Sequence, residues 1–479
     1  MGFGQRIGQT FRVPGHGLRR SLIVMVVLVV AAGCGVVISL TAPALAGNLG
    51  LVASQPVLAP PGPDLVLVPL QAEAPVPTSA GLDSMLDPLA DSDTLGRFTG
   101  VVLDPAAPAA STSLWERSPE RALVPGSTGK LLTAAAALLT LDSTDRLTTR
   151  VAPGPEPGTV VLVGGGDPTL TALPPGTDSV YPQPARLSEL AAEVREATAG
   201  PIKRVLIDTS RYEGRTLAPG WDPADVADGF VAPIEPLMLD GGRVDPTLQD
   251  GPRITDPALA AGRALAEMLG ADPDKVAEGT AVPDAKSLGI VSSATVGELV
   301  EHVMRSSDNV LAEALAREVA KVRDGERSFT GAAAQTVAAL TQAGFDTTGV
   351  VLVDGSGLSN QDRVPARLLG AVLAAAAAPA LGERDTQFLR PIITGLPVAG
   401  GDGTLDERFA VDAASASGRG AVRAKTGTLT GVSSLAGVAT DADGRLLVFA
   451  LMSNGASPAV VRPRMDAMAA ALSRCGCRR

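Results

Sequence analysis

Residues 123–133 read Leu-Val-Pro-Gly-Ser-Thr-Gly-Lys-Leu-Leu-Thr, and this stretch places a turn directly before an apolar helix. Pro125 and Gly126 indicate the turn. The residues from Lys130 onward are apolar nearly all round, which predicts a helix that is buried on most sides. We expect Ser127 to cap this helix. Residues three apart share one helix face at about 5–6 Å, so the Ser127 hydroxyl and the Lys130 amine should lie close together.

This hydroxyl and amine can act as a nucleophile and its base. The positive end of the helix and burial both disfavour an ammonium group, so both lower the pKa of Lys130. A neutral Lys130 can then take the proton of Ser127. Histidine offers little alternative, because the chain has only His16 and His302. His16 precedes an N-terminal apolar segment, and we expect His302 on a helix face without a catalytic role.

A second hydroxyl lies in Ser307-Asp308-Asn309, on an expected turn between helices near 296–305 and 310–322. The Asn309 amide can donate a hydrogen bond to a substrate carbonyl. Asp308 is expected to be structural rather than catalytic.

A third motif, Lys425-Thr426-Gly427-Thr428, lies on an expected late strand. Lys425 supplies a cation, and the hydroxyls of Thr426 and Thr428 can hold a substrate carboxylate. We expect Gly427 to leave room for a substrate backbone beside the strand.

Composition limits the classes of protein to consider. The chain has 479 residues and is 45% hydrophobic and 19% charged, which is too long for one ordinary core and predicts two folded units. Its net charge of −11 opposes binding to nucleic acid. The two His and three Cys are too far apart for a zinc site, so we expect no metal and no other cofactor. Cys475-Gly476-Cys477 is expected to be a frayed end rather than a disulfide framework.

The first 46 residues have the pattern of an export signal. An uncharged apolar run at 21–40 is followed by Ala44-Leu45-Ala46 and preceded by basic residues, namely Arg6, Arg12, Arg19 and Arg20. The run is 20 residues long, so both a cleaved signal peptide and an uncleaved membrane anchor through residues 21–40 stay open. In either case the charge asymmetry places the rest of the chain outside the cytoplasm.

The exported part divides into several segments. Residues 47–89 are rich in Pro and suit an extended linker. Mixed helix and strand signals in an α/β (α+β) pattern indicate one domain built from 90–145 and 287–470, which ends in an antiparallel meander. Residues 146–286 have their own mixture of helix and strand signals, and we expect them to form an insertion between the two halves. Residues 471–479 are a basic tail.

Together the three motifs resemble those of the serine penicillin-recognising enzymes, and more closely the D-alanyl-D-alanine carboxypeptidase/endopeptidase family of low-molecular-mass penicillin-binding proteins. The resemblance covers about 90–455 and departs from the family at Gly126 and Gly129, where we expect Ala and a bulkier residue. This family carries an inserted domain between its first and second motifs. Further segments are similar to its signatures, namely Val163–Leu170 (Val-Gly-Gly-Gly-Asp-Pro-Thr-Leu), Pro219-Gly220-Trp221, Asp354–Ser359 (Asp-Gly-Ser-Gly-Leu-Ser) and Asp402-Gly403-Thr404-Leu405.

The resemblance implies a β-lactamase/transpeptidase-like domain and an acyl-transfer cycle without metal or cofactor. Ser127 would attack the bond between two D-Ala residues of a peptidoglycan stem peptide, and water would release the acyl-enzyme. The N–H groups of Ser127 and Thr428 would form the oxyanion hole. Ser307 and Lys425 would shuttle the leaving-group proton, and Thr426 with Thr428 would hold the terminal carboxylate. β-Lactams would inhibit by acylating Ser127.

Two other functions stay open at this point. A catalytically silent envelope protein could keep the same fold to bind muropeptides, although the intact motif residues argue against it. A β-lactamase would need rapid deacylation, and the sequence assigns no carboxylate to activate that water. Carboxypeptidase and endopeptidase preference are also undecided, because both use the same nucleophile.

Overall fold

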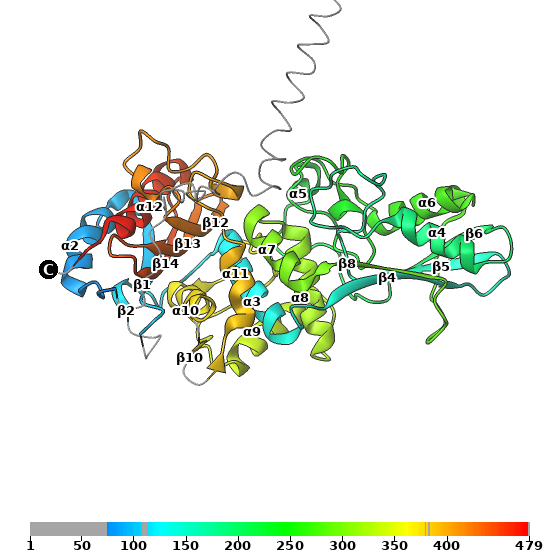
Figure 1. The fold of residues 1–479 in the computed structure, drawn as a ribbon, viewed down its shortest axis with the longest axis horizontal. Coiled ribbons are helices and arrows are strands. Elements are labelled where there is room, and N and C mark those ends of the chain that lie inside the picture. The colour runs from blue at the N-terminus through cyan, green and yellow to red at the C-terminus, as the bar shows by residue number, and fades with distance from the viewer. Residues whose placement is uncertain (1–73, 108–112, 379, 382–383, 478–479) are drawn as a thin grey trace, which may run out of the picture. The chain divides into compact units, whose positions relative to one another are not determined.

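The computed structural model describes residues 74–107, 113–378, 380–381 and 384–477 (Figure 1). The predicted signal or anchor at 1–46 and the linker up to residue 73 lie outside this part of the chain. No helix within the described ranges is long and apolar enough to cross a membrane.

The first sheet is antiparallel, and the C-terminal meander forms three of its five strands. Its strands run in the order β12-β13-β14-β1-β2. Their bounds are β1 (Arg97–Leu103), β2 (Ser113–Arg117), β12 (Val422–Leu429), β13 (Val432–Thr440) and β14 (Leu446–Asn454). The predicted meander is thereby confirmed, and β1 inserts from the other end of the chain to pair with β14.

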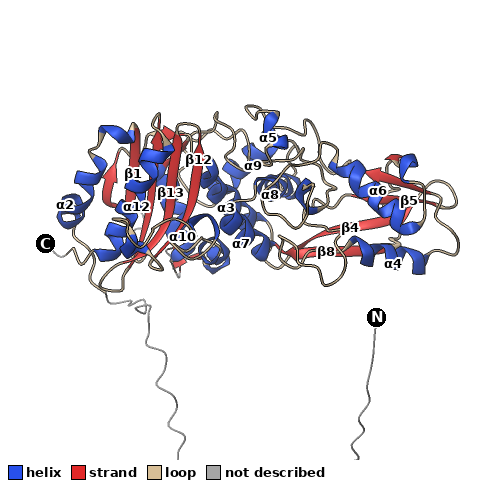
Figure 2. Cartoon of the chain, turned by 90° about the horizontal axis from the view of Figure 1, so that it is seen from above, coloured by secondary structure: helices blue, strands red, loops and turns tan. Residues whose placement is uncertain are grey.

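Helices cover both faces of this sheet. Side chains alternate along a strand, so Phe449 faces α12 and α2 while Val448 and Ala450 face α10 and α3. Figure 2 shows α12 lying across the strands. The helices of this domain are α2 (Ser79–Ala90), α3 (Lys130–Thr140), α7 (Val296–Ser306), α8 (Asn309–Val322), α9 (Phe329–Gln342), α10 (Ala366–Ala377), α11 (Arg390–Thr394) and α12 (Pro458–Arg474).

The inserted segment folds around a second, mixed sheet in the order β7-β6-β5-β4-β8. β5 pairs in parallel with β6, and β6 with β7, while β4 is antiparallel to both of its neighbours. α4 and α6 pack on this sheet through a separate apolar core. The elements are β4 (Arg146–Pro153), β5 (Thr159–Val163), β6 (Arg204–Asp208), β7 (Ala277–Glu278), β8 (Gly289–Thr295), α4 (Leu187–Ala197), α5 (Ala224–Ala227) and α6 (Pro257–Leu269).

Two small strand pairs complete the described elements. β3 (Ala122–Leu123) pairs with β9 (Val364–Pro365), and β10 (Ala380–Leu381) pairs with β11 (Arg384–Asp385). The first of these pairs fixes the segment immediately before Ser127.

The predicted boundary at 286/287 is wrong. β8, which we had placed in the larger domain, pairs with β4 from Gly289 to Thr295 and therefore belongs to the inserted module. The chain returns to the larger domain at Val296, where Thr295 caps α7 in a reciprocal capping box with Glu298. We call residues 146–295 the inserted module from here on.

The linker boundary at residue 89 is also wrong. α2 begins at Ser79, and its Leu82 and Leu86 are buried against α12 and the sheet. The helix falls inside a stretch that we assigned to the linker from its Pro content. Burial of its apolar face outweighs the Pro88 within it.

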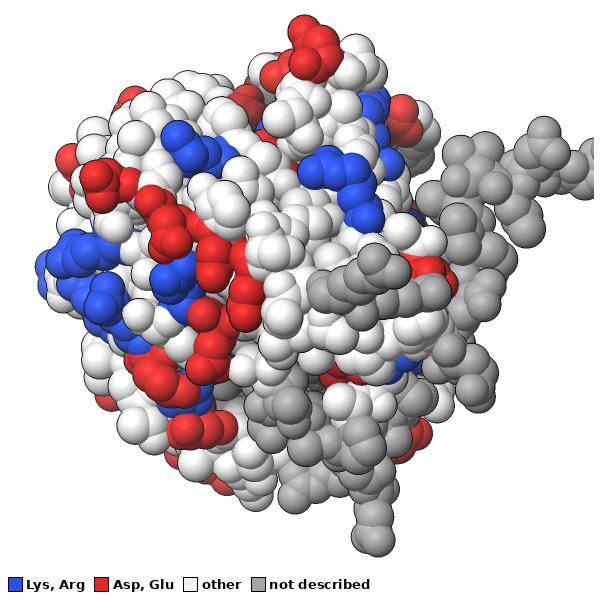
Figure 3. All heavy atoms as spheres, turned by 90° about the vertical axis from the view of Figure 1, so that its left-hand side faces the viewer, with Lys and Arg blue, Asp and Glu red and all other residues white. Residues whose placement is uncertain are grey.

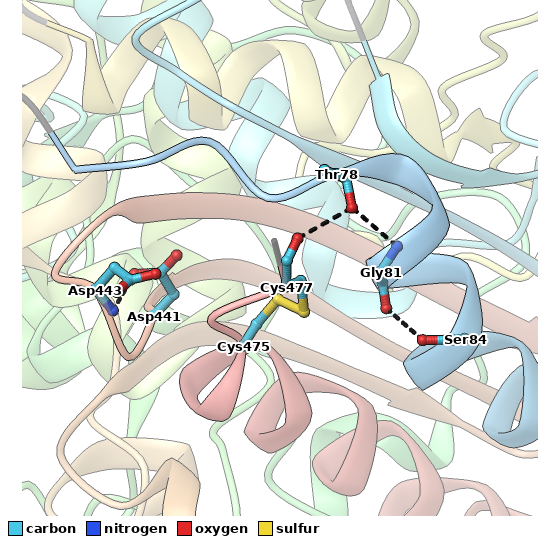
Figure 4. The surroundings of a disulfide bond; sticks show 7 residues. All are labelled: Thr78, Gly81, Ser84, Asp441, Asp443, Cys475 and Cys477. Carbon is cyan, nitrogen blue, oxygen red and sulfur yellow. Dashed lines mark hydrogen bonds between the residues drawn. A yellow bond between two sulfur atoms is a disulfide. The ribbon is translucent and has the colours of Figure 1, made fainter. Parts of the chain in front are cut away.

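The C-terminal segment is not frayed. α12 runs to Arg474, Cys475 is buried, and Cys475 forms a disulfide with Cys477. Figure 4 shows the Cys477 carbonyl beside Thr78, whose N–H and hydroxyl both donate to it at 2.8 and 3.1 Å. The Thr78 hydroxyl in turn accepts from the N–H of Gly81 and caps α2. Cys477 therefore holds the start of α2. Local composition does not reveal this contact, because the two residues lie far apart in the chain.

Charges of both signs mix on the surface beside α2 and α12. Figure 3 shows Lys and Arg side chains next to Asp and Glu on this face rather than a patch of one sign. In this region the Arg117 guanidinium forms ion pairs with two carboxylates, those of Asp87 on α2 and of Asp91 directly after this helix.

Replacing Leu86 by Ala should destabilise the larger domain by about 2–5 kcal/mol, because the side chain is 1% exposed and its loss leaves a cavity. Urea denaturation of the chain from Gly47 measures this change. Asp83→Ala on the exposed face of the same helix is the control and should change the unfolding free energy by less than about 0.5 kcal/mol. If both substitutions changed the unfolding free energy equally, α2 would not be packed on the domain and would belong to the linker.

Candidate active site

Ser127 lies in a single 3₁₀ turn, Gly126–Gly129, that leads into α3. The expectation that it caps this helix is wrong: the cap position is Gly129, and no side chain caps there. The Ser127 Oγ instead accepts a hydrogen bond from Lys130 Nζ at 2.9 Å. Gly126 has a φ of 55°, which L-residues rarely adopt, so glycine suits this position where we expected Ala.

Lys130 is fully buried and donates all its protons to the protein. Besides Ser127, its Nζ donates to Asn309 Oδ1 at 2.5 Å and to the Ser356 carbonyl at 2.7 Å. Burial lowers the pKa of Lys130 to about 8, although Asp354 and then Glu313 oppose the shift. Burial thus shifts this pKa in the direction that the sequence analysis expects.

Lys425, on β12, meets the second motif. Its Nζ donates to Ser307 Oγ at 2.8 Å and to the Thr426 carbonyl at 3.0 Å. Burial, and then the charge of Lys130, hold the pKa of Lys425 well below its ordinary value. The three motifs thus form one chain of contacts, although they are far apart in the sequence.

The second motif lies between α7 and α8, as predicted. Ser307 ends α7 with a left-handed φ of 62°, and Asp308 caps α8 by accepting from the Leu311 N–H at 2.8 Å. Asp308 therefore has the structural role that we expected. The Asn309 amide also contacts the inserted module, because its Nδ2 donates to the Phe230 carbonyl at 2.8 Å.

Residues of the third motif border the segment that carries Ser127. The Thr426 hydroxyl donates to Thr404 Oγ1 at 2.9 Å. A Cβ on Gly427 would lie 2.5 Å from the Pro125 carbonyl oxygen and 3.0 Å from the Ser127 nitrogen. Close packing within the protein thus requires glycine here.

The Thr428 N–H lies next to the same turn. A Cβ on Gly126 would be 3.1 Å from the Thr428 nitrogen, and one on Gly427 would be 3.0 Å from the Ser127 nitrogen. The backbones that bear these two N–H groups therefore pack directly against each other at the mouth of the site.

A cleft of about 390 Å³ opens at Ser127. The larger domain contributes Ser127, Ser306–Asn309, Leu358 and Thr428–Thr430, whereas the inserted module contributes Asp225, Gly229, Phe230, Gln249, Asp250 and Arg253. Sequence reasoning missed the residues of the inserted module, since they lie in loops without a motif. The nearest signal was Pro219-Gly220-Trp221.

The loop Asp354–Ser359 supplies one of the hydrogen-bond acceptors of Lys130. Asp354 accepts from the indole N–H of Trp221 at 2.7 Å and from the N–H groups of Gly357 and Ser359 at 2.7 and 2.6 Å. This arrangement presents the Ser356 carbonyl to Lys130. Ser356 thus contributes its backbone only, which agrees with the expectation that it lies near the cleft without a catalytic role.

Glu313 was missed by the sequence analysis. It lies one turn after Asn309 on α8, is fully buried, and accepts from the N–H groups of Gly355 and Ser356. Burial raises the pKa of Glu313 to about 8, and the neighbouring Asp354 adds to the shift. Its sequence signal is weak, because the polar Asn309 and Arg317 lie one turn before and after it on the same face of α8.

His302 lies on α7, as expected, and its ring packs against that of Tyr181 at 5.2 Å between centroids. Burial lowers its pKa. No group of three or more metal-ligating side chains occurs within the part of the chain that the structure describes.

Comparison with known proteins adds a family to this geometry. The model of the D-Ala-D-Ala carboxypeptidase 3 (S13) family matches residues 82–252 and 250–475. The chain is 45% identical over 431 residues to carboxypeptidase Rv3627c of Mycobacterium tuberculosis, which covers 89% of this chain and 91% of the relative. It is also 45% identical over 430 residues to carboxypeptidase DacB of Mycolicibacterium smegmatis, with 89% and 90% covered.

A solved structure has the same architecture. Penicillin binding protein 4 of Haemophilus influenzae superposes with a TM-score of 0.64 at 20% identity and covers 81% of this chain and 97% of that one. At this identity the likeness bears on the fold alone, and it confirms the predicted transpeptidase-like α/β fold with its second mixed module.

Substituting Asp362→Asn should stabilise the protein at pH 7 and above. Asp362 is buried beside Asp354, and burial followed by that charge raises its pKa to about 10. A raised carboxyl pKa means that the folded state keeps a proton that the unfolded state loses, so stability falls as pH rises from about 4 toward 10. An amide cannot ionise, so the variant does not bear this cost.

Unfolding free energies at pH 5, 7 and 9 measure the effect. We expect the advantage of Asp362→Asn over the wild type to grow with pH. Asp412→Asn on the exposed surface is the control and should show no such growth. A wild type that gains stability over the variant between pH 5 and 9 would contradict the assignment of a protonated Asp362.

Proposed function

The chain belongs to the D-Ala-D-Ala carboxypeptidase 3 (S13) family of serine peptidases and is a carboxypeptidase; from this premise we propose that it removes the terminal D-Ala from peptidoglycan stem peptides through an acyl-enzyme on Ser127. One observation carries the assignment of the nucleophile. The fully buried Lys130 amine donates to Ser127 Oγ at 2.9 Å at the floor of a cleft.

Acylation begins when Ser127 Oγ attacks the carbonyl carbon between the two D-Ala residues. Lys130, in its neutral form, accepts the hydroxyl proton as the new C–O bond forms. The negative charge that develops on the carbonyl oxygen lies between the N–H groups of Ser127 and Thr428. The close approach of Gly126 and Gly427 supports this role, since it brings the two N–H-bearing backbones together.

The intermediate then collapses, and the C–N bond breaks. The departing amine of D-Ala takes a proton from Ser307, which in turn takes one from Lys425. The contact of 2.8 Å between Lys425 Nζ and Ser307 Oγ supports this path. The hydroxyls of Thr426 and Thr428 hold the carboxylate of the leaving D-Ala.

Water completes the cycle by attacking the ester carbonyl and releasing Ser127. When the departing amine belongs to a second stem peptide, the same steps cleave a crosslink, so an endopeptidase activity needs no other catalytic group. β-Lactams present a carbonyl to the same nucleophile, and we expect them to acylate Ser127.

We further propose that the enzyme works outside the cytoplasmic membrane. The basic residues before the apolar run 21–40, followed by Ala44-Leu45-Ala46, support export. Peptidoglycan as the substrate agrees with this location. The same run supports either a secreted protein or one anchored through residues 21–40, and detergent partitioning of the full chain separates the two.

Ser127→Ala should abolish both penicillin labelling and release of D-Ala from stem pentapeptides. The expected loss is at least about 1,000-fold in kcat, because the covalent step disappears. Intact mass and peptide mapping after incubation with a labelled penicillin measure the adduct, and amino-acid analysis measures D-Ala. Ser188→Ala on α4 of the inserted module is the matched control and should keep both activities.

Each outcome separates the alternatives. A stable adduct on Ser127 with D-Ala release supports the carboxypeptidase, whereas an adduct that turns over rapidly identifies a β-lactamase. A folded protein without an adduct, whose envelope function survives Ser127→Ala, would be a silent binding protein.

The rate constant of acylation should rise with pH and level off above about 8. Lys130, whose pKa burial lowers to about 8, lacks a free electron pair below that pH and cannot accept the proton. Rapid-quench mass spectrometry between pH 6 and 10 measures the profile. Lys203→Met, which removes an exposed lysine, should leave it unchanged. A rate that is flat or falls between pH 6 and 8 would exclude Lys130 as the base.

A further inference from the structure

Arg243 of the inserted module lies buried beneath the second motif. Its side chain is 1% exposed, and its Nη2 forms an ion pair with Asp308 Oδ2 at 3.0 Å. Nη1 donates to Tyr181 Oη at 2.8 Å and to the Asp240 carbonyl at 3.0 Å. Tyr181, also from the inserted module, donates its own hydroxyl to the same Asp308 oxygen at 3.0 Å.

Asp308 divides its two oxygens between the two modules. Oδ1 accepts from the Leu311 N–H and begins α8, while Oδ2 belongs to Arg243 and Tyr181. A buried carboxylate needs such partners, because an unpaired buried charge is costly. Burial opposes ionisation of Asp308, but Arg243 and then Arg253 outweigh it and hold the pKa of Asp308 well below its usual range.

The two neighbours of Asp308 carry chemistry. Ser307 Oγ accepts a hydrogen bond from Lys425 Nζ, and Asn309 Oδ1 accepts one from Lys130 Nζ. Ser307 also has a left-handed φ of 62°, a conformation that the surrounding structure has to maintain. A shift of Asp308 would therefore move both groups at once.

We propose that Arg243 is a positioning residue: through Asp308 it fixes the Ser307 hydroxyl and the Asn309 amide where Lys425 and Lys130 meet them, so that the inserted module completes the second motif. This inference rests on the proposed function, in which Ser307 relays a proton and Lys130, the partner of Asn309, accepts the proton of Ser127. A displacement of about 1 Å at such groups can cost about 100-fold in rate.

The inserted module has other attachments to α8, so replacing Arg243 should not release it. Arg211 forms an ion pair with Glu318. Arg317 donates to the carbonyls of Glu213 and Arg215 at 3.0 Å. These contacts lie two and more turns along α8 from the motif, which leaves Arg243 and Tyr181 as the contacts at Asp308 itself.

Arg243→Met tests the inference in the chain from Gly47. A positioning role predicts complete acylation by labelled penicillin, one adduct per molecule, at a rate constant about 10-fold to 100-fold below that of the wild type. Arg243→Lys keeps the charge without the forked donor and should fall between the two. A merely structural role predicts a reduced fraction of acylated protein that reacts at the wild-type rate.

Arg445→Met is the matched control. Arg445 forms a comparably buried ion pair with Asp104, with side chains 11% and 2% exposed, in the larger domain away from the motifs. Labelled penicillin should acylate the Arg445→Met variant at the wild-type rate, even if the thermal stability of this variant falls. An equal loss of rate in Arg445→Met would overturn the inference, because the effect would then follow from general destabilisation.

Tyr181→Phe decides the case if Arg243→Met does not fold. It removes only the hydroxyl and keeps the ring against His302, and we expect acylation to slow about 3-fold to 10-fold. Rate constants within twofold of the wild type in the folded variants would overturn the inference while the proposed function stands. If the wild type itself is not acylated, the proposed function fails and the inference falls with it.

Discussion

The buried amine of Lys130 is the constraint on which the site depends. An amine without water needs a partner for each of its protons, and here the partners come from three separate segments: Ser127, Asn309 and the carbonyl of Ser356. The turn before α3, the start of α8 and the Asp354–Ser359 loop must therefore meet at one point. The helices around α3 and the first sheet are the packing that brings them there.

Electrostatic balance around this amine explains the acids behind it. Burial lowers the pKa of Lys130, while burial and then the charge of Lys130 lower the pKa of Lys425. Asp354 and Glu313 act in the opposite sense on Lys130. Burial and the neighbouring Asp354 raise the pKa values of both Glu313 and Asp362, because adjacent buried carboxylates disfavour one another's ionisation. The result is a buried amine whose pKa lies below its ordinary value, as the proposed role of Lys130 as the base requires.

The inserted module is part of the active site and not an appendage to it. It lines the cleft, accepts the Asn309 amide at the Phe230 carbonyl, and pairs Arg243 with Asp308. A minimal acyl-transfer domain would have to satisfy these groups in another way. Our inference about Arg243 gives one physical reason why the chain returns to the catalytic domain only after a full module: the second motif begins α8 with a charge that the module neutralises.

The sequence by itself determined what local geometry determines. Helical spacing brings Ser127 to Lys130, apolar periodicity marks α7 and α8, and alternation marks the strands of the meander, so the three motifs and the family could be named from residues alone. Tertiary structure decided the rest: that β8 pairs with β4, that α2 is packed rather than part of a linker, that Cys475 is buried and bonded, that Glu313 accepts from the Ser356 N–H, and that Arg243 pairs with Asp308. These contacts join residues far apart in the chain, and they form because burying apolar surface and pairing buried charges lowers the free energy of the whole fold, which no short window of sequence records.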